Sequence, residues 1–211
     1  MDAAAAAVRS VWADNFKAES AAFRQIAPHA THVALNVQYP GCVVRDDARK
    51  SHYDMTAEER YQVVRANVAL LKPLQVGLAV RTGDGGRFAW EFNLRGFDAA
   101  SGLDARDPDS IAYLARRGLP DDVGAFMEMV RLLLGPSVYD VKRLARQHDR
   151  SYVGALSHIV KQLGVVQPDE PKPTPAGTGS TLALLAFETL KEKLGANADK
   201  YRGQLCGLQA V

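Results

Sequence analysis

Residues 56–94 read TAEERYQVVRANVALLKPLQVGLAVRTGDGGRFAWEFNL. The first four have the capping-box pattern, in which Thr56 accepts a hydrogen bond from the third helical amide and Glu59 reaches back to the Thr56 amide. An amphipathic run from Tyr61 to Leu71 follows, so this stretch predicts a helix. Two β-prone runs, Leu74–Arg81 and Arg87–Leu94, then enclose three glycines. Because glycine supplies the positive φ angles of a tight turn, these runs predict a β-hairpin.

The segments before this stretch predict a helix and a short strand. Apolar residues recur at nearly helical spacing from Val8 to Ile26, interrupted by Asp14-Asn15, and Pro28 ends the pattern. His32–Val37 then reads as a short buried strand, because the turn dipeptide Pro40-Gly41 follows it.

The segments after the hairpin are mainly helical in pattern. We expect a short strand at Ser137–Val141 and helices at 110–117, Val123–Leu134, Lys142–Gln147 and Tyr152–Leu163. Prolines between residues 166 and 179 predict an extended loop, since proline lacks an amide donor. Ser180 is expected to cap a last helix that closes at Gly195. The order of elements predicts a single α/β domain over residues 1–211, with helices covering a sheet.

Composition narrows the classes of protein that fit. The chain has 211 residues, of which 47% are hydrophobic, enough for one good core. Its 26 Lys and Arg nearly balance 24 Asp and Glu, so charge gives no strong reason to expect nucleic acid or a membrane surface as partner. Cys42 and Cys206 lie far apart, and no apolar run is long enough to span a bilayer. We therefore expect a cytoplasmic or nuclear location, or both, and no membrane association.

A series of short motifs runs along nearly the whole chain. In order these are Val11-Trp12-Ala13-Asp14-Asn15, the helix-plus-strand segment 59–78, Trp90-Glu91-Phe92-Asn93, Asp109-Ser110-Ile111, the segment 138–144 and Tyr201-x-Gly203-x-Leu205-x-Gly207-Leu208. Together they resemble the CAF1/POP2 family of CCR4-NOT deadenylases, in a degenerate and shortened plant-type form. The resemblance implies a ribonuclease H-like fold, a mixed sheet flanked by helices, in proteins that remove poly(A) tails within the CCR4-NOT complex.

The resemblance also implies where two magnesium ions would be held, and this chain departs from the family there. The family's Asp-Thr-Glu-Phe-Pro-Gly is replaced by Asn36-Val37-Gln38-Tyr39-Pro40-Gly41, which keeps the shapes of both ligands and loses both charges. Gly179 stands at the fourth carboxylate position and Thr174 at the family histidine. The third ligand's motif is absent between Arg117 and Val138, so one strand-helix segment is expected to be missing. Because magnesium needs anionic oxygen ligands, we expect no metal cofactor and no catalysis.

Other residues are candidates for chemistry or binding. Asp46-Asp47, Asp121-Asp122 and His29-x-x-His32 are better explained as loop or cap residues than as metal ligands. A basic cluster is a candidate for nucleic-acid contact, although a solvated helix face is the commoner explanation: Lys142, Arg143, Arg146 and Arg150. An apolar stripe is expected to be core, but becomes a candidate interface if the missing strand leaves it uncovered: Phe126, Val130 and Leu133.

Three functions follow as hypotheses. The first is an inactive deadenylase-like protein that binds protein partners, including the CCR4-NOT scaffold or a second copy of itself. The second is a module that binds RNA or DNA without cleaving it, and the third is a residual poly(A)-specific exoribonuclease. The lost carboxylates favour the first, with weak or absent RNA binding.

Overall fold

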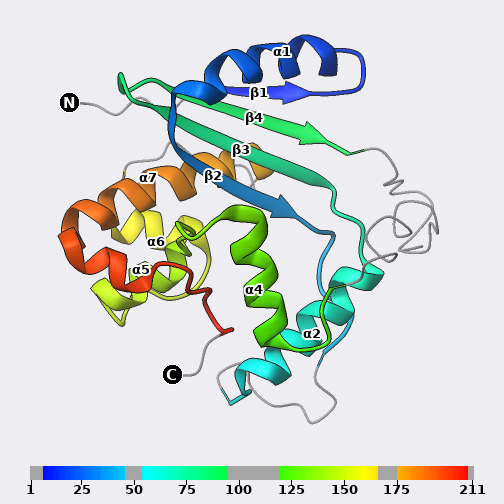
Figure 1. The fold of residues 1–211 in the computed structure, drawn as a ribbon, viewed down its shortest axis with the longest axis vertical. Helices are drawn as coiled ribbons and strands as arrows, with labels where there is room; N and C mark the ends of the chain where they lie inside the picture. Colours follow the sequence, from blue (N-terminus) through cyan, green and yellow to red (C-terminus); the bar gives the residue numbers. More distant parts are fainter. Residues whose placement is uncertain (1–6, 46–53, 95–118, 166–174, 209–211) are drawn as a thin grey trace.

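The computed structural model describes residues 7–45, 54–94, 119–165 and 175–208. Four strands form one sheet in the order β1-β4-β3-β2: β1 (Val8–Val11), β4 (Arg87–Asn93), β3 (Gln75–Thr82) and β2 (Ala30–Gln38). β1 runs parallel to β4, while β3 is antiparallel to both of its neighbours. The sheet is therefore mixed, as predicted (Figure 1).

Helices lie on both faces of this sheet. α7 (Ala176–Leu194) packs against all four strands on one face, and α5 (Val141–His148) and α6 (Leu156–Gln162) pack on α7. The opposite face, called here the outer face, carries α1 (Phe16–Ile26) over β1 and β4 (Figure 1). A short 3-10 turn, η1 (Ala27–His29), leads from α1 into β2, and η3 (Gly195–Tyr201) follows α7.

Two helices form a smaller unit beside the sheet. α2 (Ala57–Leu70) begins at the capping box, with both Thr56 and Glu59 hydrogen bonds present, and α4 (Val123–Leu134) packs against it. Tyr61 links the pair, because its ring lies 5.0 Å from that of Phe126 and its hydroxyl donates to the Pro120 carbonyl. None of the helices in the described part of the chain combines the length and apolarity that crossing a membrane requires.

The helix beginning at Thr56 and the hairpin are confirmed, but two other expectations about local structure are wrong. Residues 8–11 are a strand rather than helix, because pairing with β4 satisfies their backbone and the Asn15 side chain bonds both Trp12 N and Ser10 O to close the turn. Residues 137–140 belong to no strand. Instead the Val138 carbonyl accepts from Gly203, and Asp140 caps α5 by accepting from the Arg143 amide.

The proline-rich loop predicted for residues 166–179 is also partly wrong. Residues 166–174 lie outside the described ranges, but α7 already begins at Ala176. Its first amides are satisfied by the sheet: Ala176 donates to Gln75 Oε1 and Gly177 to Glu91 Oε2. Because side chains distant in sequence cap this helix, a local serine cap is unnecessary, and Ser180 lies inside it.

Candidate functional site

Three of the four positions that the resemblance assigns to the metal site lie in described elements. Asn36 and Gln38 are on β2, two residues apart, so both side chains face α7. A Cβ atom added at Gly179 of α7 would lie 2.3 Å from Asn36 Nδ2 and 2.9 Å from its Cγ. The fold thus brings Asn36 and Gly179 together, as the resemblance implies. Thr174 lies outside the described residues.

The first turn of α7 lies unusually close to the strands. A Cβ atom at Gly77 of β3 would lie 1.9 Å from the Ala176 carbonyl oxygen, and one at Gly177 would lie 2.4 Å from Val8 Cγ1. Only glycine permits such an approach of helix backbone to strand backbone. Helix backbone therefore occupies the face of the sheet directly beside Asn36.

A polar network fixes this turn of α7 and was not foreseen from the sequence. Gln75 and Glu91 accept from the first two helical amides, and Gln75 Nε2 also donates to Glu91 Oε1 at 3.2 Å and to Asn93 Oδ1 at 2.9 Å. Glu91 is thus a carboxylate at a helix N-terminus, where the helix dipole favours negative charge. The sequence signal that could have pointed to this network is strand alternation, which puts Glu91 on the same face of the sheet as Ala89.

The side chains of this region offer few anionic oxygens. Asn36 and Gln38 are neutral amides, Gly179 has no side chain, and the Glu91 carboxylate already accepts from Gly177 and Gln75. Across the described residues, no three His, Cys, Asp or Glu side chains are grouped so that they could hold a metal ion.

The paired acids and histidines behave as local structural residues where they are described. Asp122 caps α4 by accepting from the Ala125 amide, and Asp121 forms an exposed ion pair with Arg65. Asp46-Asp47 lies outside the described residues. His29 is in the 3-10 turn and His32 is in β2, so the two do not share a helix.

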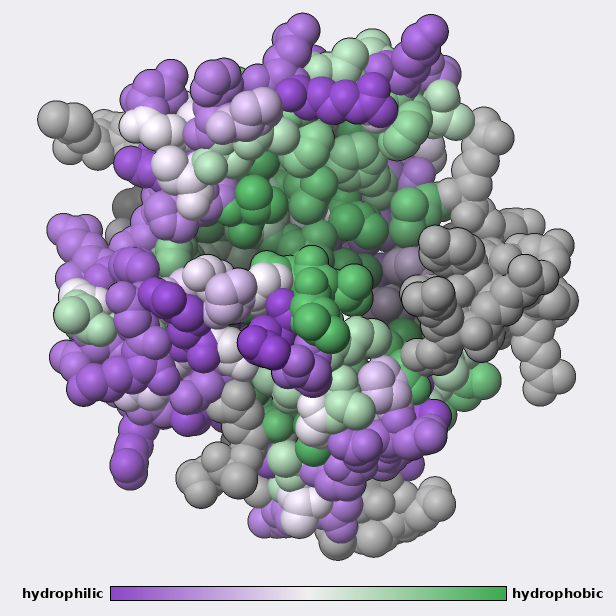
Figure 2. Space-filling model, viewed as in Figure 1, coloured by the Kyte–Doolittle hydropathy of each residue, from purple (hydrophilic) through white to green (hydrophobic). Residues whose placement is uncertain are grey.

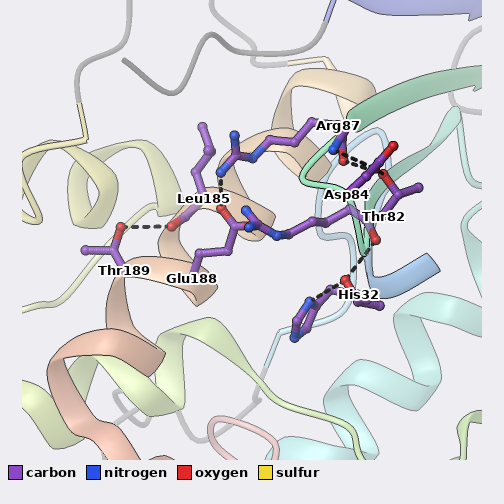
Figure 3. Close-up of polar contacts among 10 residues, drawn as sticks. His32, Thr82, Asp84, Arg87, Leu185, Glu188 and Thr189 are labelled. Carbon is purple, nitrogen blue, oxygen red and sulfur yellow. Dashed lines mark hydrogen bonds and ion pairs between the residues drawn. The ribbon is translucent and has the colours of Figure 1, made fainter. Parts of the chain in front are cut away.

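A second polar cluster ties the hairpin to the middle of α7 (Figure 3). Glu188 receives ion pairs from Arg81 and Arg87, each at 2.8 Å. His32 lies beside this cluster with its ring 5.3 Å from Phe187, and burial lowers its pKa although the nearby Glu188 carboxylate opposes the shift. Within the hairpin, a hydrogen bond from Thr82 lowers the pKa of Asp84. These contacts hold the hairpin strands β3 and β4 against α7. None of them points to a residue that would take part in a reaction.

The basic cluster is partly used inside the protein. Arg143 donates to Gln204 Oε1 and lies over the Tyr201 ring, so it holds the C-terminal segment against α5. Asp140 does the same through both oxygens, accepting from Arg143 N and Cys206 N. Lys142 and Arg150 are exposed, whereas Arg146 is only partly exposed. The cluster does not form one open cationic face.

The candidate interface stripe on α4 is not core, contrary to expectation. No residue of α4 is buried; Phe126 and Val130 are half-buried and Leu133 is exposed. Amphipathic spacing predicts an apolar face but not what covers it. Here contacts between α2 and α4 join Tyr61 to Phe126 and the Glu58 carboxylate to the Val123 amide, both near the start of α4.

Known proteins resemble this chain in sequence and fold. A model of the CAF1 family ribonucleases matches residues 11–100. The Arabidopsis thaliana protein named probable CCR4-associated factor 1 homolog 7 is 25% identical over 269 residues of alignment, which cover 95% of this chain and 93% of that protein. Poly(A) ribonuclease POP2 of Saccharomyces cerevisiae is 29% identical over 117 residues, 53% of this chain and 26% of that protein.

Solved structures give the same result for the fold. S. pombe Pop2p in its Mg²⁺- and Mn²⁺-bound form matches with a TM-score of 0.71 at 20% identity, covering 95% of this chain and 99% of that one. CAF1 co-crystallised with the yeast NOT1 MIF4G domain matches with a TM-score of 0.66 at 21% identity, covering 94% and 96%. The predicted ribonuclease H-like fold, a mixed sheet with flanking helices, is confirmed. The chain is thus similar to the CAF1 family ribonucleases, whose family model matches residues 11–100, and to plant CCR4-associated factor 1 homologues over most of its length.

Proposed function

We propose that this protein is a catalytically inactive relative of the CAF1 deadenylases that acts by binding other proteins. The observation that carries the proposal is the contact between Asn36 and Gly179. These two positions stand where the family resemblance puts metal-binding carboxylates, and here an amide lies against a helix backbone that has no side chain.

The donor set does not fit a pair of magnesium ions. Magnesium binds through carboxylate oxygens because their charge offsets the cost of removing its water shell. Asn36 and Gln38 contribute no charge, and Glu91 is engaged by the first turn of α7. A carboxylate at residue 179 would also require the Asn36 side chain to move, since its Cβ atom would lie 2.3 Å from Asn36 Nδ2. The residues present at these positions therefore do not fit a magnesium-dependent nuclease site.

The lengths of the alignments support a missing segment. The alignment with the Arabidopsis homolog 7 extends over 269 residues, more than the 211 of this chain, so that relative carries residues without a counterpart here. Among the described residues, β2 has a neighbouring strand on only one side. Both observations agree with the loss of a strand-helix segment that would have carried a further ligand.

A protein partner from the CCR4-NOT scaffold is the binding role that the comparisons support best. The yeast NOT1 MIF4G domain was co-crystallised with CAF1, a structural neighbour of this chain. We expect a purified MIF4G domain to be retained by the immobilised chain. In the cell, we propose that this binding takes place in the cytoplasm, the nucleus or both. No retention at micromolar concentration, with yeast CAF1 retained in parallel, would contradict this role.

Restoring the lost charges should not restore cleavage. We expect Asn36→Asp combined with Gln38→Glu to leave an adenylated RNA at full length with Mg²⁺ or Mn²⁺, because Gly179 still supplies no ligand and the third ligand is missing. The matched control is Asn36→Ala with Gln38→Ala, which should behave identically in the assay. Metal-dependent shortening by the acidic double variant alone would show that the remaining donor set suffices, and the proposal would fail.

A further inference from the structure

β2 is an edge strand in the part of the chain that the structure describes. Within those residues β3 is the one strand beside it, so the other edge of β2 has no strand partner. An edge strand presents a row of amides and carbonyls with which another chain can pair. β2 has nine residues, whereas β1 at the opposite edge of the sheet has four. The edge of β2 is therefore the longer of the two.

The ladder bonds decide which residues of β2 face this edge. Thr82 N donates to Gly86 O at one end of the hairpin, and Leu74 O accepts from Leu94 N at the other. Even-numbered residues of β3 therefore pair with β4. Because alternate residues of an antiparallel strand bond to opposite neighbours, odd-numbered residues of β3 pair with β2. Their partners in the register are His32, Ala34, Asn36 and Gln38.

The residues between these partners direct their amides and carbonyls away from β3: Val33, Leu35 and Val37. The side chains of the same three residues lie on the outer face and are 58%, 53% and 37% exposed. Figure 2 shows apolar surface over the strands below α1 and over α4, whose leucines are also exposed: Leu132, Leu133 and Leu134. Side chains of a strand alternate between faces, so every second side chain of an added strand would lie beside Val33, Leu35 and Val37.

β2 carries none of the usual features that prevent strand addition over this stretch. Soluble proteins protect sheet edges with charged side chains, prolines or bulges. β1 contains Arg9, which forms an ion pair with Glu19 of α1 at 2.8 Å. β2 contains no Lys, Arg, Asp, Glu or Pro, and its irregular register lies between Ala30 and His32, at its start. The segment from residue 33 to residue 37 is thus regular and uncharged.

We propose that the edge of β2 binds an extended segment of a partner protein, which joins the sheet as a further strand. The backbone groups select this kind of partner, because an extended chain presents amides and carbonyls at the same spacing. A helix has already satisfied its own backbone, and a nucleic acid has no such repeat. The exposed side chains add a preference for apolar residues at alternate positions of the segment. This inference rests on the proposed role in binding proteins and states the chemistry of one partner.

Residue-resolved hydrogen exchange of the full chain, followed by NMR, tests the proposal. In the free chain the amides of Val33, Leu35 and Val37 should exchange faster than those of Ala34 and Asn36, which bond to β3. An excess of the peptide Lys-Thr-Val-Thr-Val-Thr-Val-Lys should slow the three outward amides by at least about tenfold. The matched control is the same peptide with its Thr and Val amides N-methylated, which keeps the side chains and should have no effect.

A pair of variants at one position separates backbone from side chain. Leu35→Pro removes an outward amide and no bond to β3, so it should raise the dissociation constant of the peptide by at least about tenfold. Leu35→Thr keeps the amide and should stay within about threefold of wild type. The two peptides make the same comparison on the wild-type chain, so the outcome does not depend on how well Leu35→Pro folds.

Three results would overturn the proposal. Protected amides at Val33, Leu35 and Val37 in the free chain would mean that the edge is already covered, by this chain or by a second copy. Equal binding of the two peptides would mean that side chains alone make the contact. The third is unchanged exchange in the presence of the unmethylated peptide. None of these experiments involves RNA cleavage or the MIF4G domain, so this inference can fail while the proposed function stands.

Discussion

Gly77→Ala should lower the free energy of unfolding by about 3 kcal/mol or more, the upper range for forcing extra atoms into a packed core. Its Cβ atom would lie 1.9 Å from the Ala176 carbonyl oxygen and 2.2 Å from the carbonyl carbon. Both neighbours are backbone, so no side chain can rotate away. Moving α7 outward would also break the hydrogen bonds from Ala176 and Gly177 to Gln75 and Glu91.

Urea unfolding of Gly77→Ala beside Gly83→Ala measures this effect. Gly83 is in the hairpin turn, where an added Cβ atom would only touch Thr31 Cγ2 at 3.8 Å, so its variant should stay within about 0.5 kcal/mol of wild type. Equal unfolding midpoints for the two variants would mean that α7 does not lie against β3. The claim that helix backbone occupies the face of the sheet beside Asn36 would then lose its support.

Trp90→Ala should cost about 4 kcal/mol, because it removes the largest fully buried side chain in the protein's described core. The Trp90 ring meets Phe23 edge-on at 5.4 Å and lies 6.3 Å from Phe88, and its indole N–H donates to Glu19. Truncation would leave a cavity beneath α1 and remove one partner of Glu19.

Trp12→Ala is the matched control, because Trp12 is 58% exposed and its indole contacts only Ser10 among the described hydrogen bonds. We expect a change of about 0.5 kcal/mol or less. Thermal unfolding followed by circular dichroism distinguishes the two variants. Similar losses of stability in both variants would indicate that α1 does not pack over Trp90 on the outer face.

Local signals predicted those elements whose hydrogen bonds are local. The Thr56 capping box and the glycines of the hairpin act within a few residues, and both are present as expected. The β1 strand and the start of α7 could not be read in this way, because their backbone partners come from β4, Gln75 and Glu91. Tertiary pairing overrides local propensity at such places.

For the candidate site, too, some features could be predicted from the sequence and others depend on tertiary packing. The motif around Asn36 and Gln38 placed them on one face of a strand, and β2 has this geometry. That Gly179 would approach Asn36 followed from the family resemblance rather than from spacing. The role of Glu91 and the exposure of the α4 leucines could not be predicted, since both depend on which element packs against which.

The central proposal is that this chain, although similar to the CAF1 ribonucleases, is catalytically inactive, and shortening of a labelled adenylated RNA tests it most directly. We expect the purified chain to leave the RNA at full length with Mg²⁺ or Mn²⁺, under conditions in which Saccharomyces cerevisiae POP2 shortens it. Metal-dependent shortening by the wild-type chain that Asn36→Ala with Gln38→Ala abolishes would contradict the claim, because it would make those amides part of a working site.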